Sequence, residues 1–550
     1  MKNASVNIGR VLGLLAGVTY IVSVSRTSYI QANNLGLFSN LDWTFYLSLG
    51  LLFASFFFVS RTKKAGVGLL VYPIVAAGML SALGWLAQGP NASVTNLNNY
   101  VGYFRAAQVS SAYGNIPSSV RSSAQIWGWP ASILFYSIMS GILGLSHLRA
   151  GATIVALASV LFFCFDTLIV TLLAYSLNSR NAISAVIGGF AYSVGMYFVP
   201  RWLQDTGFAY SIFLVSVASL LLLRRNEKGQ RILVSLLMVV SVLSNFYESI
   251  IIMAFVVVYA LRTKSRWPLL VSIPAIGAWL IFGYTSGFIS LFQMTLTRAF
   301  QFGTLLTSLT TSVGTGTLEH HVITASGLLL AAIYFIWAMV VMISARIRIG
   351  RFGFTSQAFL YILAFAAAGV IIGPSFGGEN PIEALERVFI FAFPFVIAMM
   401  SQGSYKRLVP LVLMLLIVLS PLGIIASYGG LTTTYISPAE QASSTYIQVY
   451  GMVTPWVLVS PSGYGSYPMY LPVAYSIFGH YVSVLNDTTL ISALPGATHS
   501  IGGLGKQAKV AFEAIEGAES NRYAKLVAAV LSQTDVVYQN PDQMLYYTYA

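Results

Sequence analysis

Charged residues are scarce in this chain. Only 8% of its 550 residues are charged, whereas 57% are hydrophobic, and ordinary soluble domains carry about 25% charged residues. Apolar runs of roughly 17–22 residues recur along the chain, and this is the length that crosses the hydrocarbon core of a bilayer. The runs are continuous and do not alternate, which excludes a closed β-barrel. We therefore predict an all-α polytopic membrane protein.

Cysteine is nearly absent, since Cys164 is the single thiol in the sequence. One thiol excludes an internal disulfide, and no Cys/His spacing is typical of a zinc site. Cys164 lies in an apolar run, so we interpret it as a packing residue. We predict no metal-ligating residues and no defined cofactor. A divalent metal ion stays an open alternative. Glu319, His320 and His321 are interpreted mainly as a solvated loop, and contact with a divalent metal or with the acceptor is the minority interpretation.

Acidic residues are also few, 16 against 29 basic ones, which leaves a formal charge of +13. The basic residues fall in short clusters between apolar runs and not on a soluble aromatic-basic patch, so we exclude nucleic-acid binding. Cytoplasmic loops of membrane proteins are rich in Lys and Arg. We therefore expect a cytoplasmic N-terminus and place inside the clusters around residues 2–10, 61–64, 147–149, 224–231, 262–266, 346–351 and 406–407.

This orientation predicts about thirteen transmembrane helices. The run 182–198 breaks the alternation, so we expect it to be a re-entrant or interfacial helix. Residues 1–427 form the predicted transmembrane domain with an external loop at 88–129, and residues 428–550 form an external C-terminal domain of α/β or mixed structure. The predicted helices are 8–24, 43–60, 66–87, 130–146, 152–173, 207–223, 232–245, 248–261, 267–288, 326–343, 357–373, 387–402 and 409–427.

A carboxylate interrupts the apolar segment "SVLSNFYESIIIMAFVVVYALRTKSR". The predicted helices on either side of it have about 14 residues each and reach only about 21 Å, short of a core of about 30 Å. Their connection should therefore stop inside the membrane and face a water-filled cavity open to the outside. Glu248 in this connection is a candidate catalytic group, and capping of the second helix is the alternative.

Three other acids lie near or inside apolar runs. We expect Asp166 to pair with an Arg or a polar neighbour for packing, with chemistry as the alternative. Asp42 precedes the helix at 43–60 and is interpreted mainly as its N-cap, with catalysis as the alternative. Asp205 lies four residues after Arg201, where a local salt bridge or a site at a cavity rim are both open.

Several segments, taken in order, look familiar. They include "NLGLFSNLDWTFYLSLGLLFASF", "AQIWGWPASILFYSIMSGILGL", "AYSVGMYFVPRWLQDTGFAYSIFLVSVASLLLLRR", "LSNFYESIIIMAFVVVYAL" and "ENPIEALERVFIFAFPFVIAMM". The chain resembles a divergent family of archaeal polytopic membrane proteins in the GT-C glycosyltransferase superfamily. This resemblance implies a GT-C-like fold with an external active site. It also implies sugar transfer from a polyprenyl-phosphate donor, usually assisted by a carboxylate in an early external loop.

The chain departs from the family pattern at several positions. The loop 88–129 contains no Asp or Glu, and Asn98 and Asn99 stand where the family typically has an acid. The family's Ser-His-Pro position reads Ser-Asn-Phe at 244–246, and Ala131 replaces a Gly. Loss of catalysis, with retention of the fold, is therefore a second hypothesis.

Glycosyl transfer from a lipid phosphate needs a carboxylate for the acceptor hydroxyl and cations for the departing phosphate. Arginine suits the second task because its planar fork binds phosphate oxygens in pairs. The candidate catalytic residues are Glu248, Asp42, Asp205 and Glu379. The candidate phosphate- or substrate-binding residues are Arg105, Arg201, Arg298, Arg387, Asn245, Tyr247 and Trp129.

Some of these candidates have simpler interpretations. Arg387 lies four residues after Glu383, so an ion pair along one helix is the alternative to phosphate binding. Trp129 and the tyrosines of the 88–129 loop could stack on sugars, or they could form an aromatic belt at the membrane interface.

Three functions stay open. The first is a membrane glycosyltransferase with a polyprenyl-phosphate-linked donor on the external face. The second is a catalytically degenerate scaffold or surface-envelope accessory protein. The third is a secondary transporter, because a carboxylate between two short helices also suits a transport site. The predicted partners are the lipid bilayer and the lipid-linked sugar, and the predicted location is the cell membrane, multi-pass.

Overall fold

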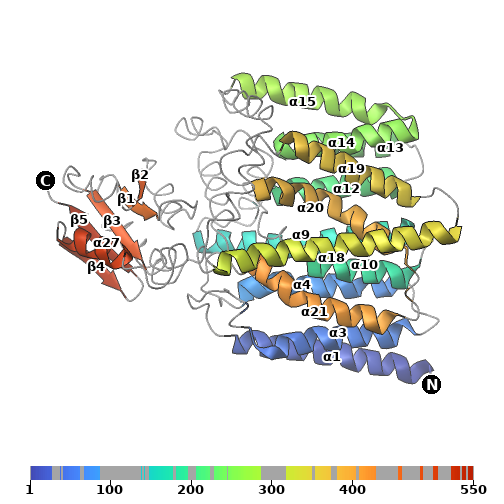
Figure 1. The fold of residues 1–550 in the computed structure, drawn as a ribbon, viewed down its shortest axis with the longest axis horizontal. Helices are drawn as coiled ribbons and strands as arrows, with labels where there is room; N and C mark the ends of the chain where they lie inside the picture. The colour runs from blue at the N-terminus through green and yellow to red at the C-terminus, as the bar shows by residue number, and fades with distance from the viewer. Residues whose placement is uncertain are drawn as a thin grey trace.

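The described part of the chain is a helix bundle followed by a small sheet (Figure 1). The computed structural model describes residues 2–27, 38, 41–61, 67–86, 138, 142, 148–177, 181–195, 206–222, 228–244, 246–285, 318–349, 354–372, 381–403, 405, 408–428, 456–460, 483–486, 500–505, 522–532, 535–540 and 543–548. The predicted helix at 130–146 lies outside the described residues apart from positions 138 and 142.

The bundle helices follow the apolar runs of the sequence. A short 3-10 turn at Val67–Leu70 precedes α4. The helices are α1 (Lys2–Arg26), α3 (Trp43–Ser60), α4 (Val71–Leu86), α9 (Leu148–Leu177), α10 (Ala182–Gly195), α12 (Thr206–Leu222), α13 (Lys228–Ser244), α14 (Phe246–Thr263), α15 (Trp267–Thr285), α18 (Leu318–Ile349), α19 (Phe354–Ile372), α20 (Pro381–Met400) and α21 (Val409–Tyr428).

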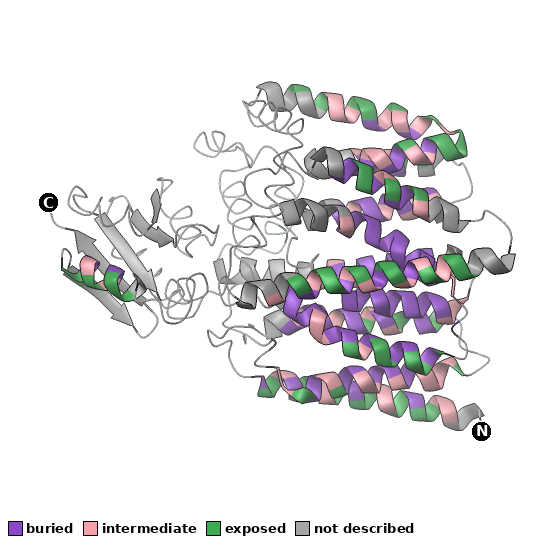
Figure 2. Cartoon of the chain, in the orientation of Figure 1, coloured by how far each residue is buried: buried purple, intermediate pink, exposed green. Residues whose placement is uncertain are grey.

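Four of the described helices contain segments long and apolar enough to cross a membrane, namely Ser5–Arg26, Trp43–Ser60, Ala325–Ser344 and Val409–Ala426. The outer helices also carry large exposed apolar side chains, such as Leu14, Ile21, Leu411 and Val418 (Figure 2). Such a surface suits lipid, because hydrocarbon carries no penalty for apolar contact. The prediction of a polytopic helical membrane protein is confirmed, whereas the number of spans stays a prediction.

The bundle has two ends, which we name by the two ends of α1. The near end is the one at which α1 begins and α3 ends, where Gly9 packs against Val59, and α10 begins at the same end (Figure 1). The far end is the opposite one, where α1 stops at Arg26 and α3 starts after Asp42. The helices lie side by side across the bundle (Figure 1).

Helix α10 occupies the centre of the bundle. Of its 14 residues, 12 are buried. A Cβ atom on Gly189 would lie 2.2 Å from Thr171 Oγ1 and 2.8 Å from the Pro73 side chain, so the absence of a side chain permits this close crossing. The prediction of an interfacial helix at 182–198 is therefore wrong, while burial in protein agrees with the re-entrant alternative.

Cytoplasmic placement of the cluster at 147–149 predicts that the helix at 152–173 starts at the same end of the bundle as the other basic clusters. This prediction is also wrong. Gly189 contacts Thr171 in α9, and the Tyr192 ring stacks on Phe163, so α9 and α10 are antiparallel. Because α10 starts at the near end, α9 must end there, and α9 starts at the far end. The segment around Arg149 therefore lies apart from the other basic clusters. Contacts between α9 and α10 set this direction, and the hydropathy pattern does not reveal them.

Helices α13 and α14 are longer than the sequence predicted. They have 17 and 18 residues, which correspond to about 26 Å and 27 Å. The prediction of two spans of about 14 residues is therefore wrong. Both helices extend into the polar and basic residues at the ends away from their connection, since α13 starts at Lys228 and α14 continues to Thr263. The argument that their connection must stop deep inside the membrane loses its main support.

A tyrosine ties α18 to the turn between α20 and α21. Trp337 Nε1 donates to the Tyr405 hydroxyl at 3.1 Å, and that hydroxyl donates to the Met400 carbonyl. Burial raises the pKa of the Tyr405 phenol above its usual value. The hydroxyl therefore keeps its proton, and the contact persists across the physiological pH range.

The tail contains a five-stranded mixed sheet in the order β2-β1-β3-β5-β4. Strands β1 (Trp456–Ser460), β2 (Ser483–Asn486) and β3 (Ser500–Gly505) are parallel, while β4 (Asp535–Asn540) and β5 (Gln543–Thr548) join antiparallel. Helix α27 (Arg522–Leu531) buries Leu526 and Val530. The sheet lies beyond the far end (Figure 1). The domain boundary at 427/428 stays a prediction.

Candidate functional site

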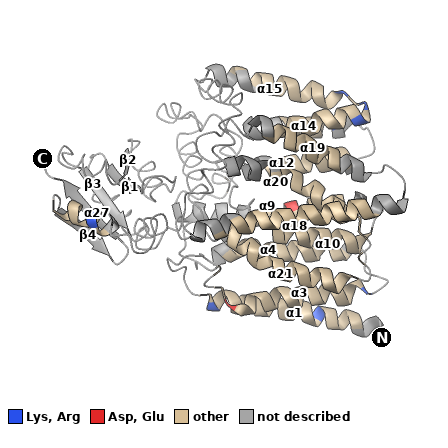
Figure 3. Ribbon diagram, viewed as in Figure 1, with Lys and Arg blue, Asp and Glu red and all other residues tan. Residues whose placement is uncertain are grey.

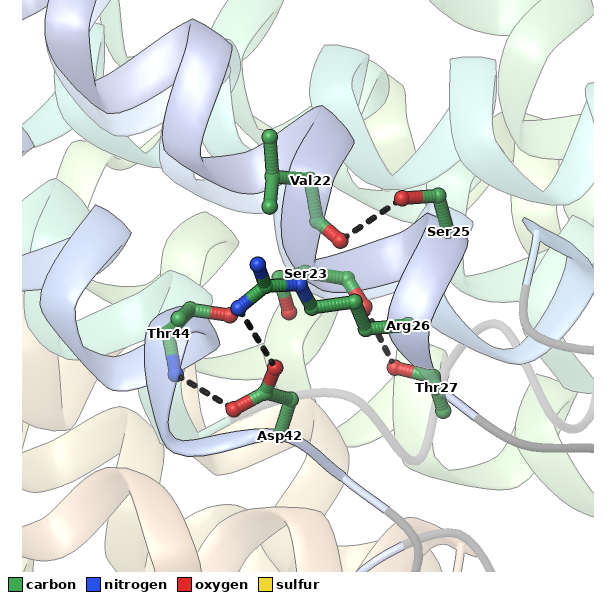
Figure 4. Close-up of polar contacts among 7 residues, drawn as sticks. All are labelled: Val22, Ser23, Ser25, Arg26, Thr27, Asp42 and Thr44. Carbon is green, nitrogen blue, oxygen red and sulfur yellow. Dashed lines mark hydrogen bonds and ion pairs between the residues drawn. The ribbon is translucent and has the colours of Figure 1, made fainter.

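A small polar cluster lies at the far end, where α1 stops and α3 begins (Figure 4). The two helices form an antiparallel pair that is held closely together. Ser5 Oγ donates to the Phe58 carbonyl at 2.8 Å, and Ser55 Oγ donates to the Gly9 carbonyl at 2.6 Å. This packing sets the position of the residues at the other end of the pair.

Asp42 caps α3. Its backbone is extended, with φ −67° and ψ 141°, and its Oδ1 accepts a hydrogen bond from the Thr44 amide at 3.2 Å. A carboxylate at this position satisfies an amide that has no partner within the helix and opposes the positive end of the helix dipole. The N-cap interpretation of Asp42 is confirmed.

The second oxygen of Asp42 faces a cation. Arg26 Nη1 lies 3.9 Å from Asp42 Oδ2, and the two side chains are 63% and 17% exposed. This single, long and exposed contact differs from the short bidentate pairing that makes Arg–carboxylate pairs strong. Arg26 was not among the predicted site residues. Its signal in the sequence was its position after an apolar run, away from every predicted cytoplasmic cluster.

Two hydroxyls beside this ion pair have no partner. Ser23 Oγ and Thr44 Oγ1 are buried and make no hydrogen bond to any described residue. Ser23 lies three residues before Arg26 on the same helical face, and Thr44 follows the cap (Figure 4). Buried polar atoms are normally hydrogen-bonded. Among the described residues, both hydroxyls are therefore unsatisfied donors enclosed by protein beside the ion pair.

The remaining candidates are only partly within the described residues. Glu248 and Tyr247 lie on the first turn of α14, and Arg387 lies on the second turn of α20, but their side chains are outside the described residues. The rest lie wholly outside them, namely Asn245, Asp205, Glu379, Arg105, Arg201, Arg298 and Trp129.

Helices α3, α14 and α20 all begin at the far end, but they do not form one cluster. Helix α3 packs on α1, α4 and α21, whereas α14 packs on α12, α13, α15, α19 and α20. Other helices lie between α3 and α14 (Figure 1). The starts of these two helices, where Asp42 and Glu248 lie in the chain, are thus well separated.

A second carboxylate lies deep in the bundle. Asp166 of α9 is fully buried, and its Oδ2 accepts a hydrogen bond from Ser211 Oγ at 2.9 Å. Its Oδ1 has no partner among the described residues. Close by, the Tyr192 hydroxyl donates to the Tyr210 hydroxyl at 3.0 Å. The prediction of a polar neighbour for Asp166 is confirmed, and that neighbour is a serine.

The described residues provide no metal centre. They contain no group of three or more His, Cys, Asp or Glu side chains that could hold an ion. Cys164 is a free thiol that contacts the Ile74 carbonyl at 3.6 Å, which fits a packing role. The side chains of Glu319, His320 and His321 are outside the described residues, so the metal alternative stays untested.

The chain shares its fold with a solved structure, that of ArnT, which agrees with the GT-C-like fold that the resemblance predicted. Among solved structures it is similar to ArnT from Cupriavidus metallidurans bound to undecaprenyl phosphate. The two are 13% identical, with a TM-score of 0.52 over 88% of this chain and 99% of that chain. Apo ArnT is 12% identical, with a TM-score of 0.51 over 87% and 98%.

An archaeal structure is also similar but less close. It is the oligosaccharyltransferase from Archaeoglobus fulgidus tethered with an acceptor peptide, at 12% identity and a TM-score of 0.48, covering 89% of this chain and 74% of that chain. No protein-family model and no curated protein sequence matches the chain. At these identities, the ArnT comparison establishes the fold and nothing finer.

Proposed function

We propose that this protein is a membrane glycosyltransferase that takes its sugar from a polyprenyl-phosphate-linked donor on the external face. The observation that carries the proposal is the fold shared with nearly all of ArnT, which was crystallised with undecaprenyl phosphate. A carboxylate beside a guanidinium at the far end supports it, because the reaction needs both groups.

The distribution of cations supports an external far end. Basic side chains of the described residues gather at the near end, at the start of α1, the end of α3 and the turn from α14 to α15 (Figure 3). By their positions in the chain these are Arg10, Arg61, Arg262, Lys264 and Arg266, and Arg231 lies at the start of α13. Among the bundle side chains that the structure describes, Arg26 is the basic one at the far end. Cytoplasmic faces of membrane proteins carry the excess of Lys and Arg. The near end is therefore cytoplasmic in our proposal, and residues 27–42 form the first external connection.

Asp42 suits the role of general base in this connection. The resemblance implies a carboxylate in an early external loop, and the loop 88–129 has none. The Thr44 amide holds one oxygen of Asp42 in place, so the other oxygen can accept the proton of an acceptor hydroxyl. The acceptor oxygen then bonds to the anomeric carbon of the sugar. The bond from that carbon to the phosphate oxygen breaks, and polyprenyl phosphate leaves.

The departing phosphate needs a cation as negative charge develops. Arg26 lies 3.9 Å from Asp42 and is near enough to bind a phosphate beside it. The predicted phosphate-binding residues Arg105, Arg201, Arg298 and Arg387 stay candidates for the same task. Glu248, Asp205 and Glu379 stay alternative bases, although Glu248 no longer has the support of two short helices.

The test is transfer from a panel of polyprenyl-phosphate sugars by the full chain in proteoliposomes. We expect transfer by the unaltered protein, a severe loss in Asp42→Asn and near-normal transfer in Glu248→Gln. The Asn substitution keeps the helix cap, because Asn caps helices about as well as Asp. A loss in Glu248→Gln with full activity in Asp42→Asn would return the role of base to Glu248.

One observation favours a second candidate function. The long external loop lacks every acid, which suits a degenerate scaffold that keeps the fold without the chemistry. This candidate predicts that the unaltered protein binds polyprenyl phosphate but transfers no sugar from any donor in the panel.

A further inference from the structure

We propose that Arg26 forms an exchangeable ion pair with Asp42, which we call the latch. Without ligand, the guanidinium lies against the carboxylate. The phosphate of a polyprenyl carrier competes for Arg26, draws it away and leaves Asp42 free to receive an acceptor. The identity of the ligand rests on the proposed function, but the exchange itself rests on the geometry of this cluster.

The ion pair is long and accessible, so another anion can replace the carboxylate. One guanidinium nitrogen lies 3.9 Å from one carboxylate oxygen, and Arg26 is 63% exposed. Exposed ion pairs of this kind contribute little to stability. Most of the guanidinium donors therefore face solvent, where an incoming anion can reach them before the pair separates.

The two partners differ in freedom, which decides which one moves. Asp42 is held by its bond to the Thr44 amide and by the start of α3, where the Phe45 amide donates to the Asp42 carbonyl at 2.9 Å. Arg26 is the last residue of α1 and has a long flexible side chain. Exchange therefore moves the arginine and leaves the carboxylate in position.

A phosphate is the better partner for this arginine. Asp42 offers a single oxygen, because its other oxygen already accepts from the Thr44 amide. A phosphate offers several oxygens in the geometry that the guanidinium fork binds in pairs.

The competition makes a specific thermodynamic prediction, since coupling between sites is reciprocal. If Asp42 and the phosphate compete for Arg26, removal of the Asp42 charge must tighten phosphate binding. A site in which Arg26 and Asp42 bind the ligand together predicts no such gain.

The experiment measures the affinity of the full-length protein for undecaprenyl phosphate, without sugar, in neutral-lipid nanodiscs. We expect Asp42→Asn to bind about two- to fivefold more tightly, the range set by a weak exposed ion pair. We expect Arg26→Gln to bind about tenfold or more weakly, as charge-assisted bonds to phosphate are lost. The double variant should bind undecaprenyl phosphate as weakly as Arg26→Gln alone, because without Arg26 there is no cation for which Asp42 and the phosphate compete.

Arg10→Gln is the matched control, since it removes the same charge from an exposed position at the near end, and its affinity should equal that of the unaltered protein. Unchanged or weaker binding by Asp42→Asn overturns the latch, as does tighter binding by the double variant or absence of binding by the unaltered protein. The assay requires no catalysis. A protein that shows the expected affinities but transfers no sugar therefore refutes the proposed function and keeps the latch.

Discussion

Two regions of this molecule each hold a carboxylate, and their surroundings are opposite. Asp42 lies at the edge of the bundle, partly exposed, with one oxygen on a helix cap and the other facing an arginine. Asp166 lies at the centre, fully buried, with a serine on one oxygen and nothing described on the other. The edge carboxylate is partly exposed and can meet a ligand, whereas the central one is fully buried.

The packing around the two regions differs in the same way. Helix α1 at the edge has exposed apolar side chains along its length, and Gly17 has open space where a side chain would go. Helix α10 at the centre is buried along most of its length, and Gly189 has no such space. A ligand can reach the edge of the bundle, so chemistry is possible there. The tightly packed centre instead sets the arrangement of the helices.

The largest expected effect is on the rate of sugar transfer, and it distinguishes Asp42 from Asp166. Asp42→Asn should lower the rate of sugar transfer by about 100-fold or more, the usual contribution of a general base. Asp166→Asn should leave the rate within a few fold of normal, because Asp166 is buried away from the far end. Initial rates in proteoliposomes measure both. Equal losses in the two variants would remove the distinction between edge and centre.

An intermediate effect tests the packing difference. Gly189→Ala should destabilise the fold by about 1–3 kcal/mol, because the new methyl group collides with Thr171 and Pro73 and overpacking has this cost. Gly17→Ala is the control and should be neutral or stabilising, since Ala is the better helix former. Thermal unfolding in detergent compares them. A destabilised Gly17→Ala beside an unaffected Gly189→Ala would contradict the arrangement of α10.

The smallest expected effect concerns the ion pair itself. Arg26→Gln should change the free energy of unfolding by about 1 kcal/mol or less, because the pair is long and exposed. Denaturant titration in detergent measures this change. A loss of several kcal/mol would show that Arg26 is a structural element of the α1–α3 pair, and the contrast with the buried centre would then disappear.

Some of these features could be predicted from the sequence because they depend on nearby residues. The scarcity of charge and the length of the apolar runs predict the membrane class. The predicted helix at 43–60 matches α3, and the cap at Asp42 follows from its position before that helix. A polar neighbour for Asp166 was predicted because a lone acid in an apolar environment needs one.

Other features depend on segments that are far apart in the sequence. The interfacial alternative for 182–198 failed because α10 is covered by α4, α9, α20 and α21, and a helix sequence does not state what covers it. The direction of α9 failed for the same reason. The lengths of α13 and α14 were underestimated because polar residues at helix ends were taken as the ends of the helices.

The amino-acid sequence by itself determined that this chain enters a membrane and where most helices begin, because transfer to lipid and helix capping depend on local composition. Only the tertiary structure decided that Arg26 meets Asp42, that Asp166 meets Ser211, and that α14 starts well away from α3. These outcomes come from packing between distant helices, which depends on the shapes of both surfaces and not on either segment alone.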